Sequence, residues 1–217
     1  MLILNDITLI TIDGVDPESA LKALIYSSKD IKFNSIKLLS FREPKGLKNN
    51  IEFIKINKLS YLDYAYFKVK KLDDYVFTSH CLIIEPDGFI INPSSWNSKF
   101  FAYDYIGAPW PVEKIDIWPY LKDYNRVGNG GFCLRSKKFL EISKKYCPFI
   151  YGEAEDMAVC RKYRNIFLEY DIKYAPIDIA IDFSIECKVP EMPQRHAPFG
   201  FHGRQYIASS ILEKVNI

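Results

Sequence analysis

One short stretch constrains the fold more than any other part of the chain. It consists of the apolar run Cys81–Ile84 and the acidic turn that follows it. An unbroken apolar run of this length between turn formers is typical of a strand buried on both faces of a sheet. Glu85 and Asp87 come directly after it and stand two residues apart, so an extended backbone would turn both carboxylates to the same face. Ligands of open α/β sheets bind at the carboxyl ends of the strands, which makes this edge the first candidate for a binding site.

The sequence Pro86-Asp87-Gly88 has two interpretations. Proline presets φ, aspartate bonds its own backbone and glycine accepts a positive φ, so a plain hairpin turn explains these residues without any ligand. Alternatively, the carboxylates of Glu85 and Asp87 bind a hard divalent cation, and the cation neutralises the oxygens of a phosphate. Turn chemistry leaves both interpretations open, and other parts of the chain have to decide between them.

The amino-terminal residues predict a β-α-β unit. A β-branched strand over 7–12 ends at Asp13, Asp16 caps a helix with Pro17 at its first position, and a second strand follows over 35–41. This order implies two parallel strands joined by a right-handed crossover. Asp13 at the end of the first strand would meet a nucleotide base or ribose, or it is an ordinary loop aspartate.

Hydrophobic spacing and capping signals place further elements along the rest of the chain. They are a strand over 51–56, a helix from Ser60 to about residue 76, a strand over 132–134, a helix over 136–145, a helix that turns Val159, Tyr163, Phe167 and Leu168 inward, a strand over 172–175 and a short helix over about 205–214. At 217 residues the sequence therefore predicts a single α/β domain over residues 1–217.

Composition excludes several classes of function. The 29 basic and 27 acidic residues form no long block of one sign, which argues against a nucleic-acid partner. Five widely spaced cysteines without a C-x-x-C pair predict reduced thiols and a cytoplasmic location. No apolar run approaches about 18 residues and the amino terminus lacks a signal-peptide core, so neither a transmembrane segment nor secretion is expected.

Two segments between the strands are candidates for substrate contacts. Aromatic residues are frequent from Trp96 to Trp110 and on to residue 126, and Trp110 belongs either to a wall for a sugar ring or to ordinary core. The glycines around Asn129 free the backbone for positive φ or for close approach to a ligand, although their spacing is not that of a phosphate-binding P-loop. Asn129, Gly130, Gly131 and Trp110 are therefore the candidate substrate-binding residues.

Acids and a histidine near the end of the chain complete the set of candidates. Glu153, Glu155 and Asp156 fall in a predicted first helical turn, where the helix dipole favours acids, so capping explains them without any chemistry. His202 is either a packed polar residue or a ligand.

Five motifs in order resemble one known family: EPDGFIINP at 85–93, YDYIGAPWP at 103–111, GNGGFCLRS at 128–136, ED at 155–156 and FGFHG at 199–203. They resemble a bacterial and viral domain family of unknown function whose members are regarded as GT-A-like glycosyltransferases. The segments at 6–13 and 16–24 match it too, so the resemblance covers nearly the whole chain. Each motif is weak by itself, but their joint order is specific.

The resemblance implies a Rossmann-like, mixed and mostly parallel sheet flanked by helices, which binds a nucleotide-sugar donor. The nucleotide is expected at the carboxyl ends of the strands, where Ile12, Asp13 and Ser40 stand with Glu85 and Asp87. Asp87 matches the last acid of the family's D-x-D-type motif, whereas Glu85 departs from the pattern at the first position, where relatives often have glutamine.

The resemblance also implies a divalent cation, Mn²⁺ or Mg²⁺, held by Asp87 and by His202, which resembles the carboxyl-terminal histidine of some GT-A enzymes. Asp156, with Glu155, resembles the x-E-D motif whose acid serves as general base. The expected function is transfer of a sugar from a nucleotide-diphosphate sugar to a hydroxyl of a glycan acceptor, with inversion. Two alternatives are a sugar nucleotidyltransferase and a non-catalytic glycan-binding module on the same fold.

Overall fold

The computed structural model describes residues 1–111, 125–194 and 197–203. Its centre is a six-stranded sheet of order β3-β2-β1-β4-β6-β5. The first four strands in this order are parallel to one another, and β6 is antiparallel to both of its neighbours. The expected mixed, mostly parallel sheet is confirmed. The strands are β1 (Leu2–Asp13), β2 (Ile31–Ser40), β3 (Glu52–Lys55), β4 (His80–Ile84), β5 (Tyr105–Ile106) and β6 (Phe132–Ser136).

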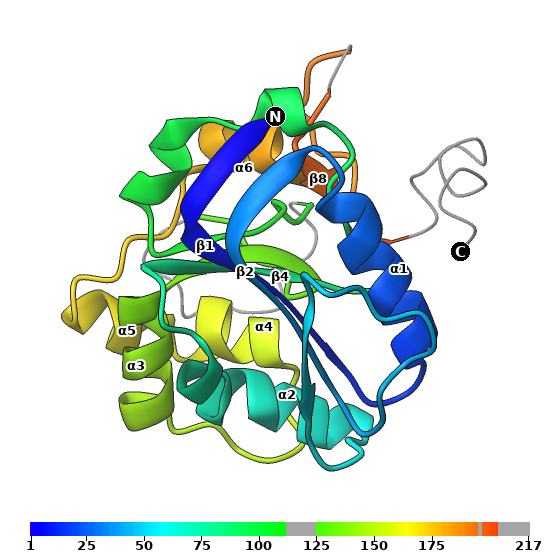
Figure 1. Cartoon of the computed structure of the whole chain (residues 1–217). Helices are drawn as coiled ribbons and strands as arrows, with labels where there is room; N and C mark the ends of the chain where they lie inside the picture. The colour runs from blue at the N-terminus through cyan, green and yellow to red at the C-terminus, as the bar shows by residue number, and fades with distance from the viewer. Residues whose placement is uncertain (112–124, 195–196, 204–217) are drawn as a thin grey trace.

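Helices cover both faces of the sheet. In Figure 1, α1 lies on one side, and α2, α3, α4 and α5 gather on the other. A small parallel pair, β7 (Ser184–Ile185) and β8 (Gly200–Phe201), lies outside the main sheet. The α-helices are α1 (Pro17–Ser27), α2 (Tyr61–Lys70), α3 (Lys137–Tyr146), α4 (Glu155–Met157), α5 (Arg164–Glu169) and α6 (Ile177–Phe183), with 3₁₀ turns at Leu72–Tyr75, Pro93–Ser95 and Ser98–Ala102 and a π-helical turn at Ala158–Lys162.

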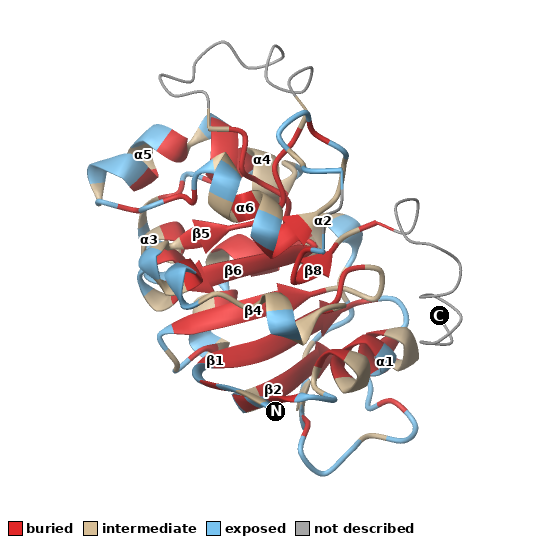
Figure 2. Ribbon diagram, turned by 90° about the horizontal axis from the view of Figure 1, so that it is seen from above, coloured by how far each residue is buried: buried red, intermediate tan, exposed pale blue. Residues whose placement is uncertain are grey.

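The run Cys81–Ile84 occupies the middle of the sheet, as its composition predicts. Each of its residues is fully buried, and β4 pairs with β1 on one side and β6 on the other. Figure 2 shows this burial continuing across the neighbouring strands from β2 to β5. Since a strand so enclosed cannot shift without exposing its side chains, the turn that follows Ile84 is held on a rigid support.

The predicted helix starts are confirmed by their caps. The Asp16 carboxylate accepts a hydrogen bond from the backbone of Ser19, and Ser60 and Asp63 form the reciprocal capping box at the start of α2. Helix α2 ends at Lys70, earlier than expected, and a 3₁₀ turn follows. Asp73 in that turn pairs with lysines of α3, so contacts with α3 shape the segment after Lys70.

Two local predictions near the end of the chain are wrong. Residues 172–175 form no strand, because only Tyr174 makes an isolated bridge, to Tyr105. Leu168 is 41% exposed instead of buried: Phe167 stacks on Phe139, and the next residue of a helix points about 100° away. The helix expected over about 205–214 and most of the aromatic segment 112–126 lie outside the described residues. Within the described ranges, no helix is long and apolar enough to cross a membrane.

Candidate active site

A cleft of about 350 Å³ opens at the carboxyl ends of β1 and β4, the edge that the sequence indicates. Its wall is assembled from the β1–α1 loop, one face of α2, the turn after β4, the glycine-rich loop before β6, the start of α4 and the residue after β8. The lining residues that bear on chemistry are Asp13, Tyr61, Lys68, Glu85, Gly130, Gly131, Glu155, Asp156 and His202. The fold thus brings most of the predicted site residues into one cavity.

The turn after β4 forms the hairpin that its sequence predicts and also brings the two candidate metal ligands Glu85 and Asp87 together. Glu85 and Gly88 exchange two backbone hydrogen bonds, each 3.0 Å long, so the hairpin turn forms. A Cβ atom on Gly88 would lie 2.9 Å from the carbonyl oxygen of Gly131 and 2.9 Å from the imidazole of His202. Glycine is therefore required because two other segments approach the turn closely, and the turn places Glu85 in the cleft wall and Asp87 beside His202.

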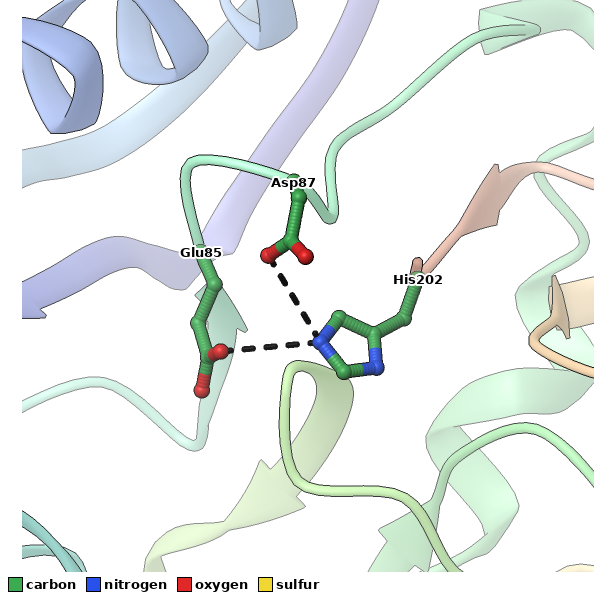
Figure 3. Close-up of side chains that lie close together, drawn as sticks. All are labelled: Glu85, Asp87 and His202. Carbon is green, nitrogen blue, oxygen red and sulfur yellow. Dashed lines mark ion pairs between the residues drawn. The ribbon is translucent and has the colours of Figure 1, made fainter. Parts of the chain in front are cut away.

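Glu85, Asp87 and His202 form a compact cluster at this turn (Figure 3). The Nε2 atom of His202 lies 3.5 Å from Glu85 Oε2 and 3.7 Å from Asp87 Oδ1. One ligand atom from each of the three residues lies within 4.8 Å of the other two. The backbone holds the histidine in place, since its N–H donates to the carbonyl of Ile185 and the N–H of Gly203 donates to the carbonyl of Asp87.

The cluster favours positive charge. Burial opposes the charged imidazole, but the carboxylates of Glu186, Glu85 and Asp87 outweigh burial and raise the pKa of His202 to about 10. Glu186 lies on the far side of the ring, with Oε1 3.4 Å from Nδ1. A metal ion bound by Asp87 and His202 would replace the imidazole proton and meet the same negative carboxylates.

The donor set suits a hard divalent ion. Carboxylate oxygens and imidazole are ligands that Mn²⁺ accepts. An ion with metal–oxygen distances of about 2.1 Å places neighbouring ligand atoms about 3 Å apart in an octahedral shell. The separations of 3.5 and 3.7 Å from His202 Nε2 to the two carboxylates need only a small contraction to reach that spacing. The residues at this turn therefore fit the expected metal.

A buried lysine that the sequence analysis missed joins three segments of the site. The Nζ atom of Lys68 donates to the carbonyl of Gly130 at 2.6 Å and lies 3.4 Å from carboxylate oxygens of both Glu85 and Glu155. Its side chain is 1% exposed. Lys68 thereby ties α2 to the β4 turn, the glycine-rich loop and α4. It follows Tyr61, Tyr64 and Ala65 at helical spacing, a pattern that signals one shared face of α2.

Glu155 and Asp156, neighbours in sequence, have different environments. Glu155 is buried and pairs with Arg135 as well as Lys68. Burial alone would raise the pKa of Glu155, but Lys68 and Arg135 outweigh it and hold the pKa below its ordinary value. Glu155 is therefore a charged anchor for α4, already engaged by two cations.

Asp156 lines the cleft, and no lysine or arginine of the described residues forms an ion pair with it. Its Oδ1 accepts a hydrogen bond from the backbone N–H of Met157 at 2.8 Å. Burial, followed by the charge of Glu155, raises the pKa of Asp156 to about 6. A carboxyl group with a pKa near neutrality in a cleft is suited to accept a proton during catalysis.

The glycine-rich loop packs closely against the side chains of Glu155 and His202. A Cβ atom on Gly130 would lie 2.3 Å from the Glu155 carboxylate, and one on Gly131 would lie 2.1 Å from Nε2 of His202. The positive φ in this loop belongs to Asn129, at 67°, whose Oδ1 accepts a hydrogen bond from Gly131. The glycines thus let the loop fit between α4 and the histidine.

Asp87 stands on the turn after β4 but outside the cleft lining, and three further predicted site residues lie away from it. Trp110 is 3% exposed, and its ring packs against Gly128 and under the guanidinium of Arg161. Ser40 is buried, and its hydroxyl donates to the carbonyl of Asp13 at 2.7 Å. Asn129 is buried in the loop described above. Ile12 and Asp13 do line the cleft, and burial raises the pKa of Asp13.

Solved glycosyltransferases share this fold. The galactosyltransferase LgtC, in complex with donor and acceptor sugar analogues, matches with a TM-score of 0.57 and 14% identity over 96% of this chain and 94% of that chain. An active-site mutant of LgtC matches with a TM-score of 0.57 and 11% identity over 96% and 95%. The fold is therefore GT-A-like.

A comparison of the sequence with known protein families identifies the family of this chain. The chain belongs to the family described as a protein of unknown function (DUF5672), whose profile matches residues 64–202. The matched segment begins in α2 and ends at His202. It includes the acid–imidazole cluster formed by Glu85, Asp87 and His202, the glycine-rich loop and Asp156. No curated protein matches the sequence.

Proposed function

We propose that this protein is a glycosyltransferase that moves a sugar from a nucleotide-diphosphate sugar to a hydroxyl of a glycan acceptor, with inversion. One observation carries the proposal: a single cleft at the carboxyl edge of the sheet is lined by Glu85 and His202, which form a cluster with the adjacent Asp87, and by a carboxyl group of α4 with a pKa near 6. The cluster can hold a cation beside a diphosphate, and the Asp156 carboxylate can accept a proton. Transfer from a nucleotide sugar requires both.

The donor binds across the ends of β1 and β4 in this proposal. Asp13 and Ile12 lie at the end of β1, where a nucleoside would be contacted, and the turn with Asp87 faces the diphosphate. Asp87, Glu85 and His202 would hold Mn²⁺ or Mg²⁺. A bound divalent ion supplies positive charge that offsets the charge developing on the diphosphate oxygens.

The acceptor reacts on the side of Asp156. Its hydroxyl oxygen attacks the anomeric carbon while Asp156 takes the hydroxyl proton. The bond from that carbon to the diphosphate oxygen breaks on the opposite face, and its electron pair leaves with the nucleoside diphosphate. Glu155 stays ionised between Lys68 and Arg135, and its charge keeps the Asp156 carboxylate basic.

The free cysteines are in keeping with a cytoplasmic site of action, which we include in the proposal.

A screen of nucleotide-diphosphate sugars, with and without Mn²⁺, tests the function. A ligand present at 100 times its Kd stabilises the protein by roughly 2.7 kcal/mol, so a true donor should raise the melting temperature measurably. Proton NMR of the product made from that donor should show the inverted anomeric configuration. Retention would contradict the mechanism, and glycan binding without any transfer would favour the non-catalytic module.

The metal site can be tested apart from turnover. We expect Asp87→Asn and His202→Ala each to weaken Mn²⁺ binding by at least about tenfold, since even outer partners of metal ligands contribute about 10–100-fold in affinity. Calorimetric titration with Mn²⁺ alone measures the change. Asp74→Asn is the matched control, because Asp74 is an exposed aspartate that pairs with Lys144 outside the cluster. Unchanged affinity in both cluster variants would leave the segment with only its role as a turn.

A further inference from the structure

We infer that Tyr61 and Tyr151 form an aromatic subsite at the mouth of the cleft, which binds a pyranose ring of the acceptor glycan. The inference rests on the proposed function for the identity of the ligand as an acceptor. It replaces the sugar-binding wall that the sequence places at Trp110, because that ring is 3% exposed and packed inside the protein.

Both tyrosine rings are unusually open to solvent. Tyr61 is 73% exposed and Tyr151 is 56% exposed. Tyr66 and Ile150, two more of the exposed large hydrophobic residues in the described chain, belong to the same two segments, α2 and the loop before α4. The two segments contact each other through Tyr151 and Asp63 and through Phe149 and Tyr66, and exposed apolar side chains gathered in this way are typical of a binding surface, whereas single ones are ordinary.

The exposed ring of Tyr151 is held in position. Its hydroxyl donates to Asp63 Oδ1 at 3.0 Å, and Asp63 is itself fixed in the capping box of α2. The turn that carries the ring is closed by Glu153, whose carboxylate accepts from the N–H of Ile150 at 3.0 Å, and by Gly152 with φ of 106°. A ring fixed before binding loses little conformational freedom when a ligand stacks on it.

The two tyrosines come from the elements that present the proposed base. Tyr61 lines the cleft at the first residue of α2, and the hydroxyl of Tyr151 is bonded two residues further along that helix. Tyr151 also precedes Asp156 by five residues, and α2 packs against α4. Neither tyrosine belongs to the turn after β4 or to β8, which carry the metal-binding cluster. The subsite is therefore assigned to the acceptor and not to the donor diphosphate.

The chemistry of a tyrosine face suits a pyranose. The C–H groups on one face of the sugar ring pack on the aromatic ring, while its hydroxyls reach water and neighbouring polar groups. Such stacking tolerates several sugars, so the subsite selects the class of ligand, and the cleft beyond it selects the reacting hydroxyl.

Saturation-transfer NMR with lactose and N,N′-diacetylchitobiose tests the subsite without any turnover. We expect signal on the ring protons of at least one disaccharide with the wild type, and loss of most of it in Tyr61→Ala and in Tyr151→Ala. Tyr61→Phe and Tyr151→Phe keep the stacking face and should retain the signal, which separates loss of the ring from damage to the fold. Phe77→Ala is the matched control: Phe77 is 82% exposed but lines a different cavity at the opposite edge of the sheet.

Kinetics with the donor found in the screen give a second readout. The two alanine variants should raise the KM for acceptor at least about tenfold. Tyr151→Ala, at a residue outside the lining of the donor cleft, should leave the KM for donor and the hydrolysis of donor by water unchanged. Absence of saturation transfer to the wild type, or a rise in donor KM in place of acceptor KM, would overturn the subsite. Tyrosine-dependent glycan binding in a protein that transfers no sugar would support the subsite and refute the proposed function.

Discussion

Asp156→Asn is expected to lower sugar transfer by at least about a hundredfold while donor affinity stays near that of the wild type. The amide has the size of the carboxylate but cannot take the acceptor's proton, so only the transition state is affected. Initial rates at saturating donor, together with calorimetric donor titration, measure the two quantities. Glu153→Gln is the matched control, because Glu153 lies just before the same helix but pairs with Lys162 outside the cleft.

The pH dependence of transfer tests the same residue. Asp156 must be ionised to act as a base, and its pKa is raised to about 6 by burial and by Glu155. The rate of the wild type should therefore rise with pH through about 6 and then level off. In Asp156→Asn the residual rate should lose this ascending limb, whereas Glu153→Gln should keep it.

The stability of the Asp156 variant should change in the direction opposite to that of an ordinary helix-terminal acid. The folded pKa of Asp156 is above its usual 3.8, so the protonated form favours folding below pH 3.8, and this contribution is lost as pH rises through about 6. Asparagine removes the charge that burial penalises. Asp156→Asn should accordingly stabilise the protein at pH 7, by up to roughly 3 kcal/mol, and have little effect below pH 3.8. A destabilised variant with full turnover would return Asp156 to a capping role.

How much of this architecture is predictable depends on the range of the interactions. The buried run Cys81–Ile84 and the capping box of Ser60 and Asp63 are local patterns, and both were correctly predicted. The hairpin turn and the proposed metal-binding role of Asp87 do not exclude each other, because the turn that forms also holds Asp87 beside His202. Sequence spacing could not show this, because the partner His202 comes from the far end of the chain.

Long-range packing accounts for the candidates that were missed or misplaced. Lys68 and the carbonyl of Gly130 are 62 residues apart, and nothing near Lys68 in sequence indicates that it will be enclosed by two acids. The same limit applies to Trp110, whose aromatic character is equally compatible with a sugar-binding wall and with core. Only the fold shows that Gly128 and Arg161 enclose its ring and that Tyr61 lines the cleft instead.

Lys68→Met is expected to destabilise the protein by about 3–5 kcal/mol, the usual cost of removing one member of a buried ion pair. Methionine fills much the same space but leaves Glu85 and Glu155 without the ammonium between them, and the carbonyl of Gly130 loses its hydrogen bond. Urea unfolding measures the change. Lys162→Met is the matched control, since Lys162 pairs with Glu153 at the surface, where solvent screens the interaction, and its loss should cost far less.

The Lys68 variant also tests whether the buried network acts on the proposed base. Lys68 lowers the pKa of Asp156, against the effects of burial and Glu155. Without the ammonium, the ascending limb of the pH–rate profile should move to higher pH, which a loss of stability alone would not cause. Lys68→Arg keeps the positive charge and should leave the limb near its original position even if the larger guanidinium fits poorly. If Lys68→Met costs no more stability than Lys162→Met and leaves the profile unchanged, the network neither holds the cleft together nor tunes Asp156.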